Sequence, residues 1–170
     1  MKNIKLNIGW ILFLAMFVTS CQKPDLPKEG GGKTFLKFVD GGEDPVVLPL
    51  DVNPVIEKIL IADLRKDALN TADANTATTV TITNTQAYLD AYNTANGTSY
   101  ELLPTSAYTI TPESGVAVSG TTWTVNLASG EFARPISINL DKSQMDLSKQ
   151  YAFGLQITQS SLGTPSLENG

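Results

Sequence analysis

The chain has 170 residues and a formal net charge of −5, and it contains no histidine and a single cysteine. The absence of histidine removes the commonest general base and the commonest transition-metal ligand, which excludes Ser-His-Asp sites, Cys-His sites and the usual zinc sites. A single cysteine excludes an internal disulfide, and the acidic charge argues against binding to nucleic acid.

The first twenty residues have the three zones of a secretory signal. Lys2 and Lys5 provide a positive start, residues 8–18 form an apolar run, and Val18-Thr19-Ser20-Cys21 ends the segment. This tetrapeptide resembles the bacterial lipobox, in which the cysteine receives a lipid before cleavage. A membrane-spanning helix needs about 20 apolar residues, and this run is shorter. We therefore predict a signal peptide over residues 1–20 and lipidation of Cys21.

Cleavage at this point removes two lysines, so the net charge of the remaining 150 residues becomes −7. Residues 21–32 contain two prolines and three glycines and are predicted to form a lipidated, flexible tether. Residues 33–170 are long enough for one domain with its own core. The lipid predicts an outer-membrane location, either at the cell surface or on the periplasmic face, with the membrane as a partner.

Most of the chain after the tether alternates apolar and polar residues with a period of two, which is typical of strands. The predicted strands cover residues 35–39, 46–52, 59–64, 79–83, 108–110, 122–127, 136–140 and 151–158. Pro49 places the second of these at a sheet edge. Residues 59–64 are apolar on both faces, as expected of a central strand. The fold class is therefore predicted as mainly β, an immunoglobulin-like antiparallel β-sandwich.

One short α-helix is predicted within this series, at about residues 85–96. Thr85 or Asn84 can cap its start, and Asn96-Gly97 is a typical stop. A stripe on one side of the helix is expected to pack on an end or edge of the sandwich; it consists of Tyr88, Ala91, Tyr92 and Ala95. Residues 66–78 are small and polar and are predicted to form a loop.

Three segments resemble a known family. They are residues 88–104 (YLDAYNTANGTSYELLP), 131–138 (EFARPISI) and 151–157 (YAFGLQI). The chain is similar, over roughly residues 34–160, to an N-terminal β-sandwich domain of unknown function. That domain occurs in Bacteroidetes surface lipoproteins from glycan-utilisation loci. In that family it often precedes an endo-β-N-acetylglucosaminidase or carbohydrate-binding module, which implies a non-catalytic role beside glycans.

The C-terminal segment departs from the family pattern. Residues 163–170 resemble the loop that precedes one more strand in family members. We therefore expect that the sandwich lacks its last strand. Since an unpaired sheet edge exposes backbone donors and acceptors, either the chain is truncated or a partner or the N-terminal segment supplies the pairing.

No pair of acidic residues stands out as the two carboxylates that a glycosidase needs. The DxxDxDxE motif of the partner endoglycosidases is absent, and the chain is too short for the barrel that carries it. We therefore predict no enzymatic activity and no cofactor. Asp40-Gly41-Gly42-Glu43-Asp44 could bind Ca²⁺, although a solvated turn is the commoner use of such a segment. Asn96-Gly97-Thr98 matches a glycosylation triplet but is interpreted as the helix stop.

Aromatic residues are the remaining candidates for ligand contact. Trp123 shares a face with Val125 and Leu127, so the core is a more natural place for it than a sugar-binding surface. The same argument favours packing for the Tyr88/Tyr92 stripe. Tyr100 and Tyr108 flank the Leu102-Leu103-Pro104 turn and are kept as candidate ligand contacts.

Three classes of function follow. The first is a non-catalytic cell-surface lipoprotein accessory to glycan binding or utilisation, with glycans or other surface lipoproteins as partners. The second is a structural, pilin-like subunit completed by a donor strand. The third is a non-catalytic front domain of a longer glycoside hydrolase.

Overall fold

The computed structural model describes residues 32–39, 51 and 53–166, and the chain divides into two compact units, residues 1–32 and 33–170. Cys21, the signal and the acidic turn at residues 40–44 lie outside the described residues. Most of the tether and most of the predicted strand 46–52 also lie outside the described residues. Asp51 is the described residue of that predicted strand, and it is not part of a strand.

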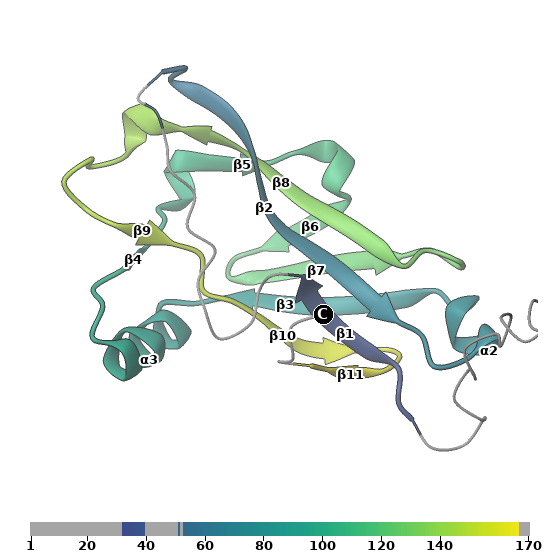
Figure 1. Cartoon of the computed structure of the whole chain (residues 1–170). Coiled ribbons are helices and arrows are strands. Elements are labelled where there is room, and N and C mark those ends of the chain that lie inside the picture. The colour runs from purple at the N-terminus through teal and green to yellow at the C-terminus, as the bar shows by residue number, and fades with distance from the viewer. Residues whose placement is uncertain (1–31, 40–50, 52, 167–170) are drawn as a thin grey trace, which may run out of the picture. The chain divides into compact units, whose positions relative to one another are not determined.

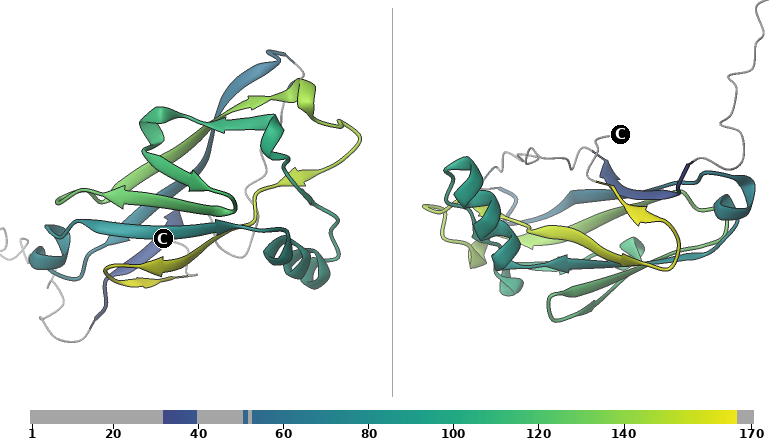
Figure 2. Two further views of the ribbon diagram at one scale, coloured as in Figure 1. Left: turned by 180° about the vertical axis from the view of Figure 1, so that it is seen from behind. Right: turned by 90° about the horizontal axis from the view of Figure 1, so that it is seen from below.

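Two sheets form the two layers of a β-sandwich (Figures 1 and 2). The first sheet has the order β11 (Thr164–Pro165), β1 (Phe35–Val39), β2 (Ile56–Asp67), β8 (Ala133–Asp141) and β5 (Tyr108–Ile110). The second has the order β10 (Leu155–Ser160), β3 (Thr78–Asn84), β7 (Thr122–Leu127) and β6 (Val116–Ser119). A small pair joins β4 (Glu101–Leu102) to β9 (Tyr151–Ala152). The predicted mainly β sandwich is confirmed.

The central strands of the second sheet follow directly from their alternating sequence. Along β3, Val80 and Ile82 are fully buried, whereas Thr79, Thr81 and Thr83, which alternate with them, are at least partly exposed. The partner strand β7 has the same phase, so Ile82 lies opposite Trp123 and Val80 lies opposite Val125. Each strand thereby turns one apolar face toward the first sheet.

The core consists of two clusters of buried residues that share the same surrounding side chains. The larger cluster includes Leu36, Leu64 and Trp123 and lies between the sheets. The smaller one comprises Leu103, Ala107, Ile138 and Leu140, near the α3 end. Both clusters are packed against a common set of partly buried residues, which are Ile61, Tyr108, Ile110 and Phe153. The two clusters are therefore parts of one continuous core.

The strand β2 is longer than predicted and is interrupted by a β-bulge. The pairing with β8 shifts between Leu60 and Ala62, which leaves Ile61 as the extra residue. Leu60 is 54% exposed, whereas Ile61 packs against both core clusters. The apolar run at residues 59–64 therefore reflects a change of phase at the bulge as well as a central position in the sheet.

The chain crosses from one sheet to the other on both sides of the sandwich. Thr111–Gly115 connect β5 to β6, and Ser161–Gly163 connect β10 to β11 (Figure 2). Residues 163–170 were expected to be a loop, but Thr164–Pro165 form β11 and pair with β1. The expected loop is therefore wrong at Thr164–Pro165, whereas the expectation that the sandwich lacks its last strand stays a prediction. The sheets are also not purely antiparallel, because β1–β11 and β4–β9 are parallel.

The predicted helix is confirmed as α3 (Gln86–Asn96), with Thr85 as its N-cap and the left-handed Gly97 at its end. Its buried residue is Leu89, however, and Tyr88 is 40% exposed. The expected packing of the tyrosine and alanine stripe is therefore wrong. The predicted loop 66–78 contains the end of β2, a one-turn helix α2 (Thr71–Ala74) and the first residue of β3. The predicted strand 151–158 is divided into β9 and β10.

Close packing at Gly154 accompanies the break between β9 and β10 at Phe153–Gly154. A Cβ atom added to Gly154 would lie 2.5 Å from the Thr85 carbonyl oxygen, so the chain passes closer to the start of α3 than any other residue allows. The Gly154 amide also donates to the buried Asn84 side chain at 2.9 Å. These contacts direct the chain from the small sheet into the second sheet.

Candidate functional site

The segment with the clearest family resemblance forms a loop that is held together by one side chain. The Asn93 side-chain amide donates to the Tyr100 carbonyl at 2.8 Å, and its oxygen accepts from the Thr98 hydroxyl at 2.8 Å and the Tyr100 amide at 3.0 Å. The Thr98 amide also donates to the Asn93 carbonyl at 3.1 Å. The asparagine of this motif therefore positions the polypeptide between α3 and β4.

Tyr100 lies on this scaffold, where its ring is 6.4 Å from the ring of Tyr92. Tyr100 is partly exposed and Tyr88, on the preceding turn of α3, is 40% exposed. A second hydrogen bond holds β4 against α3, because the Gln86 side chain accepts from the Leu102 amide at 3.1 Å. The structure thus brings Tyr88, Tyr92 and Tyr100 to one end of the sandwich, and we call these three residues the tyrosine surface.

Tyr108 lies elsewhere, within an aromatic cluster of the core. Its ring centroid is 5.0 Å from that of Phe153 and 6.4 Å from that of Trp123. Burial raises the pKa of the Tyr108 hydroxyl, although a hydrogen bond with Asn84 lowers it in part. Trp123 is 1% exposed, so its predicted core position is confirmed. Tyr100 and Tyr108 therefore do not converge on one site, and the role of each in ligand contact remains a prediction.

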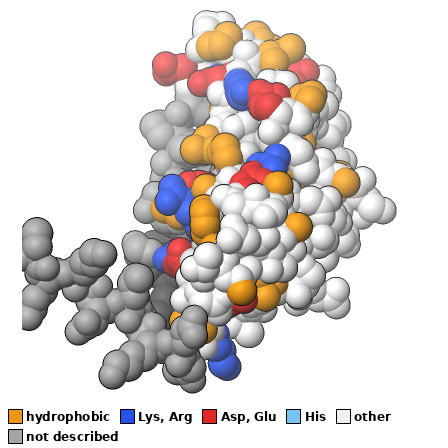
Figure 3. Space-filling view, turned by 90° about the vertical axis from the view of Figure 1, so that its right-hand side faces the viewer, with side chains coloured by type: hydrophobic (Ala, Val, Ile, Leu, Met, Phe, Trp, Pro, Cys, Tyr) orange, Lys and Arg blue, Asp and Glu red, His pale blue; other side chains and the backbone are white. Residues whose placement is uncertain are grey.

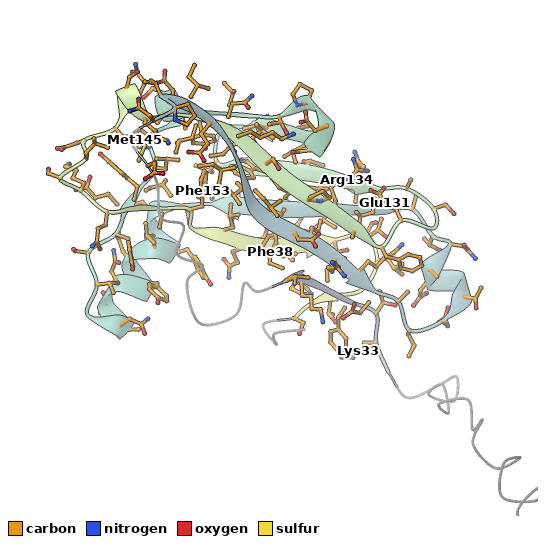
Figure 4. The ribbon with its side chains drawn as sticks, turned by 45° about the horizontal axis from the view of Figure 1, so that its top comes forward. Lys33, Phe38, Glu131, Arg134, Met145 and Phe153 are labelled. Carbon is orange, nitrogen blue, oxygen red and sulfur yellow. The ribbon has the colours of Figure 1, made fainter. Side chains whose placement is uncertain are left out.

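Three carboxylates of the described part have a lowered pKa because hydrogen-bond donors contact them. Arg134 donates two hydrogen bonds of 2.7 Å to Glu131, and this lowers the pKa of Glu131 (Figure 4). Hydrogen bonds from Ser148 lower the pKa of Asp146, and a hydrogen bond from Lys58 lowers that of Glu113. A carboxyl group that acts as a general acid needs a raised pKa, so these three are unsuited to that role.

Charged side chains of both signs lie next to one another on the face drawn in Figure 3. Among the residues that the structure describes, no group of three acidic or cysteine residues is placed to hold a metal ion. Within the same residues, no helix is long and apolar enough to span a membrane.

Two buried lysines are features that the sequence pattern did not reveal. Lys66 is 2% exposed, and its ammonium group donates to the carbonyl oxygens of Asp73, Ala74 and Thr76 at 2.9–3.3 Å. Lys142 is 6% exposed and binds the Glu57 carboxylate at 2.5 Å. Because each buried charge is satisfied by oxygen atoms of its own chain, both lysines act as structural ties.

The model of a family described as an N-terminal domain matches residues 62–163, which is more than half of the chain. A solved structure from Bacteroides ovatus, described as structural genomics of unknown function, is similar to this chain with a TM-score of 0.48 and 10% identity. That match covers 79% of this chain and 42% of the other, so this chain spans less than half of its length. No curated protein matches the chain.

Proposed function

Because the chain belongs to the family of N-terminal domains whose model matches residues 62–163, we propose that it is a non-catalytic module of a lipid-anchored surface protein, accessory to glycan binding or utilisation. The observation that carries the proposal is the order of its parts. A lipobox-like Val18–Cys21 comes first, a Pro- and Gly-containing segment follows, and the folded β-sandwich of this family comes last.

Anchoring through Cys21 is the first part of the proposal to test. A lipid chain contributes about 0.8 kcal/mol for each buried CH₂ group, and two or more chains give stable attachment. Cys21→Ser should therefore move the protein from the membrane fraction to the soluble fraction and abolish labelling by radioactive palmitate. The unsubstituted chain, expressed in the same cells, is the control. A Cys21→Ser protein that still takes up the label would contradict the anchor.

Glycan binding is the second part, and the tyrosine surface is the region that supports it. Tyrosine rings combine an apolar face with a polar tip, which suits contact with sugar rings. Affinity gels containing host N-glycans, mucin or plant polysaccharides should retard the chain that begins at residue 22. Tyr88→Ala should weaken the retardation, whereas Val118→Ala, at an exposed apolar residue of β6, should not. Unchanged mobility in every gel would remove the binding role and leave a spacer.

An assembly role is the second candidate, and one observation favours it. Strand β11 pairs with Phe35 and Leu36, so among the described residues the rest of β1 has no neighbouring strand on that side. A strand from a second copy could pair there. Sedimentation of the purified chain tests this role, because a monomer at all concentrations would exclude it.

The third candidate is a non-catalytic front domain of a longer glycoside hydrolase, and it rests on the description of the family as an N-terminal domain. The DNA that follows the coding sequence distinguishes this alternative. A reading frame that continues into a glycosidase module would support it, and an immediate stop codon would count against it.

A further inference from the structure

The strand that follows the tether lies between two neighbours of opposite direction. On one side β1 pairs with β2 in antiparallel fashion over five residues, Phe35–Val39. On the other side it pairs with β11 in parallel. The Thr164 amide donates to the Thr34 carbonyl at 2.9 Å, and the Ser166 amide donates to the Leu36 carbonyl at 2.8 Å. The first and last described strands of the sandwich are thus bonded directly to each other.

The entrance to β1 is also fastened by side chains. Thr34 is 4% exposed, and its hydroxyl donates to the Asp73 carboxylate at 2.5 Å and accepts from the Leu69 amide at 3.1 Å. A Cβ atom on Gly163 would lie 2.7 Å from the Thr34 carbonyl oxygen, so the turn before β11 packs tightly against Thr34. Lys66 in turn binds the carbonyl oxygen of Asp73 at 3.3 Å, which connects Thr34 to β2.

The direction of the two strands decides how they respond to a pulling force. The chain enters β1 near Lys33 (Figure 4). It leaves β11 at Ser166, and the two strands run in the same direction. A force that separates these two points slides β1 along β11 and along β2. In such sliding the hydrogen bonds share the load and must break together, whereas peeling breaks them one after another.

We propose that β1, β11, Thr34 and Asp73 form a mechanical clamp that resists force applied between the segment entering β1 and the segment leaving β11. The cellular use of the clamp rests on the proposed lipid anchor, which would hold the end of the chain that enters β1 while a load acts on the other end. The clamp itself depends only on the described strands. It can therefore be tested on a lipid-free chain, independently of anchoring and of glycan binding.

Single-molecule force spectroscopy on the chain with Cys21→Ser gives the test. In the first geometry the handles are attached before Lys33 and after Gly170, which loads the clamp by sliding. In the second geometry the handle before Lys33 stays in place. The other handle is moved from the C-terminus to residue 72 by Ala72→Cys, at an exposed position in α2 just after β2. Because Phe35 lies opposite Asp67, this geometry peels β1 from β2 beginning at one end. At one loading rate, we expect a several-fold higher unfolding force in the first geometry.

Thr164→Pro provides a matched variant, since proline removes the amide that donates to Thr34. It should lower the unfolding force in the first geometry by a larger factor than in the second geometry, where this bond breaks early and alone. Equal forces in the two geometries for the unsubstituted sandwich would overturn the proposal. A folded Thr164→Pro chain with an undiminished force in the first geometry would do so as well. The comparison of geometries needs no variant of the clamp, so it decides the matter even if Thr164→Pro does not fold.

Discussion

Asn93 and Glu131 each bind several partners in segments that have no regular backbone pairing. Asn93 uses both atoms of its amide to hold the segment between α3 and β4. Glu131 accepts two hydrogen bonds from Arg134 and one from the Ala128 amide, across the turn between β7 and β8. In both places a polar side chain replaces the hydrogen bonds that a strand partner would otherwise supply.

The structural role of Asn93 predicts a specific loss of stability. Asn93→Ala should lower the free energy of unfolding by about 1–3 kcal/mol, because the Tyr100 amide and carbonyl lose their partner in a partly buried place. Urea denaturation measures this change. Asn96→Ala is the matched control, since Asn96 lies in the same helix, is exposed and donates from its side chain to the Tyr92 carbonyl. If the two variants are equally stable, the assignment of Asn93 as the organiser of this loop is incorrect.

The ion pair of Glu131 predicts a dependence of stability on pH. Because Arg134 lowers the pKa of Glu131 in the folded chain, the pair stabilises the fold above the ordinary pKa of 4.5. This contribution is lost as the pH falls through the lowered pKa. Glu131→Gln should therefore reduce the free energy of unfolding at pH 7 by about 1–2 kcal/mol, given its partial exposure.

The difference between Glu131→Gln and the unsubstituted chain should shrink toward low pH, and urea denaturation at a series of pH values measures it. Glu113→Gln serves as a comparison, since the Lys58–Glu113 pair is exposed on both sides and screened by solvent. A difference that stays constant between pH 7 and pH 3 would show that Glu131 acts by packing alone.

At the scale of the elements, short-range patterns predicted the strands that carry both period-two alternation and strong apolar residues. The strands β3 and β7 are in this class, because each hides one regular face. The helix α3 was predicted instead from its N-cap Thr85 and its C-terminal Gly97. The bulge at Ile61 and the division at Gly154 were not predicted. Both depend on contacts with a distant segment, β8 in one case and the start of α3 in the other.

The crossing between β5 and β6 shows a further device that alternation does not reveal. Where β5 ends, the Ser114 hydroxyl lies beside β8, accepts from the Ser137 amide at 2.9 Å and lies 3.3 Å from the Ser137 carbonyl. The Thr111 amide donates to the same carbonyl at 2.9 Å. Ser114 therefore takes the place of the next strand residue while the chain turns toward the other sheet. Pro135, further along β8, has no amide hydrogen to leave unpaired at this edge.

Ser114→Ala should consequently destabilise the sandwich. The substitution removes the acceptor of the Ser137 amide at a site where Ser114 is 1% exposed, and the expected loss in free energy of unfolding is about 1–3 kcal/mol. Thermal or urea denaturation measures this loss. Ser119→Ala, at an exposed position of β6, should change the same quantity by less than about 0.5 kcal/mol. Similar losses in the free energy of unfolding for both variants would mean that the Ser114 hydroxyl does not take the place of a strand partner for Ser137.

At the scale of the whole molecule, the sequence predicted a sandwich with a buried Trp123 but did not place the candidate ligand contacts. Tyr100 and Tyr108 are eight residues apart, yet one lies on the tyrosine surface and the other in the core. The pairing of β1 with β11 also joins residues at opposite ends of the domain. Such long-range neighbours are set by the closure of the two sheets, which no local period encodes.

Closure around one shared set of side chains predicts that the sandwich unfolds as a single unit. Ile61, Tyr108, Ile110 and Phe153 contact both core clusters, so neither cluster can open while the other stays packed. In the chain that begins at residue 22, Trp123 is the only tryptophan, and its fluorescence reports on the larger cluster. The fluorescence and far-UV circular dichroism transitions in urea should therefore coincide.

Phe153→Ala sharpens this prediction, because Phe153 lies between the clusters and its ring centroid is 5.9 Å from that of Trp123. Its loss should lower the urea midpoints of both transitions together. The free energy of unfolding should fall by about 2–3 kcal/mol, less than for a fully buried phenylalanine. Phe35→Ala, at a residue that is 40% exposed, should have a much smaller effect. Two separated transitions in Phe153→Ala, with the tryptophan signal lost at a different urea concentration, would show that the clusters fold independently. The shared side chains would then fill space between them without coupling them.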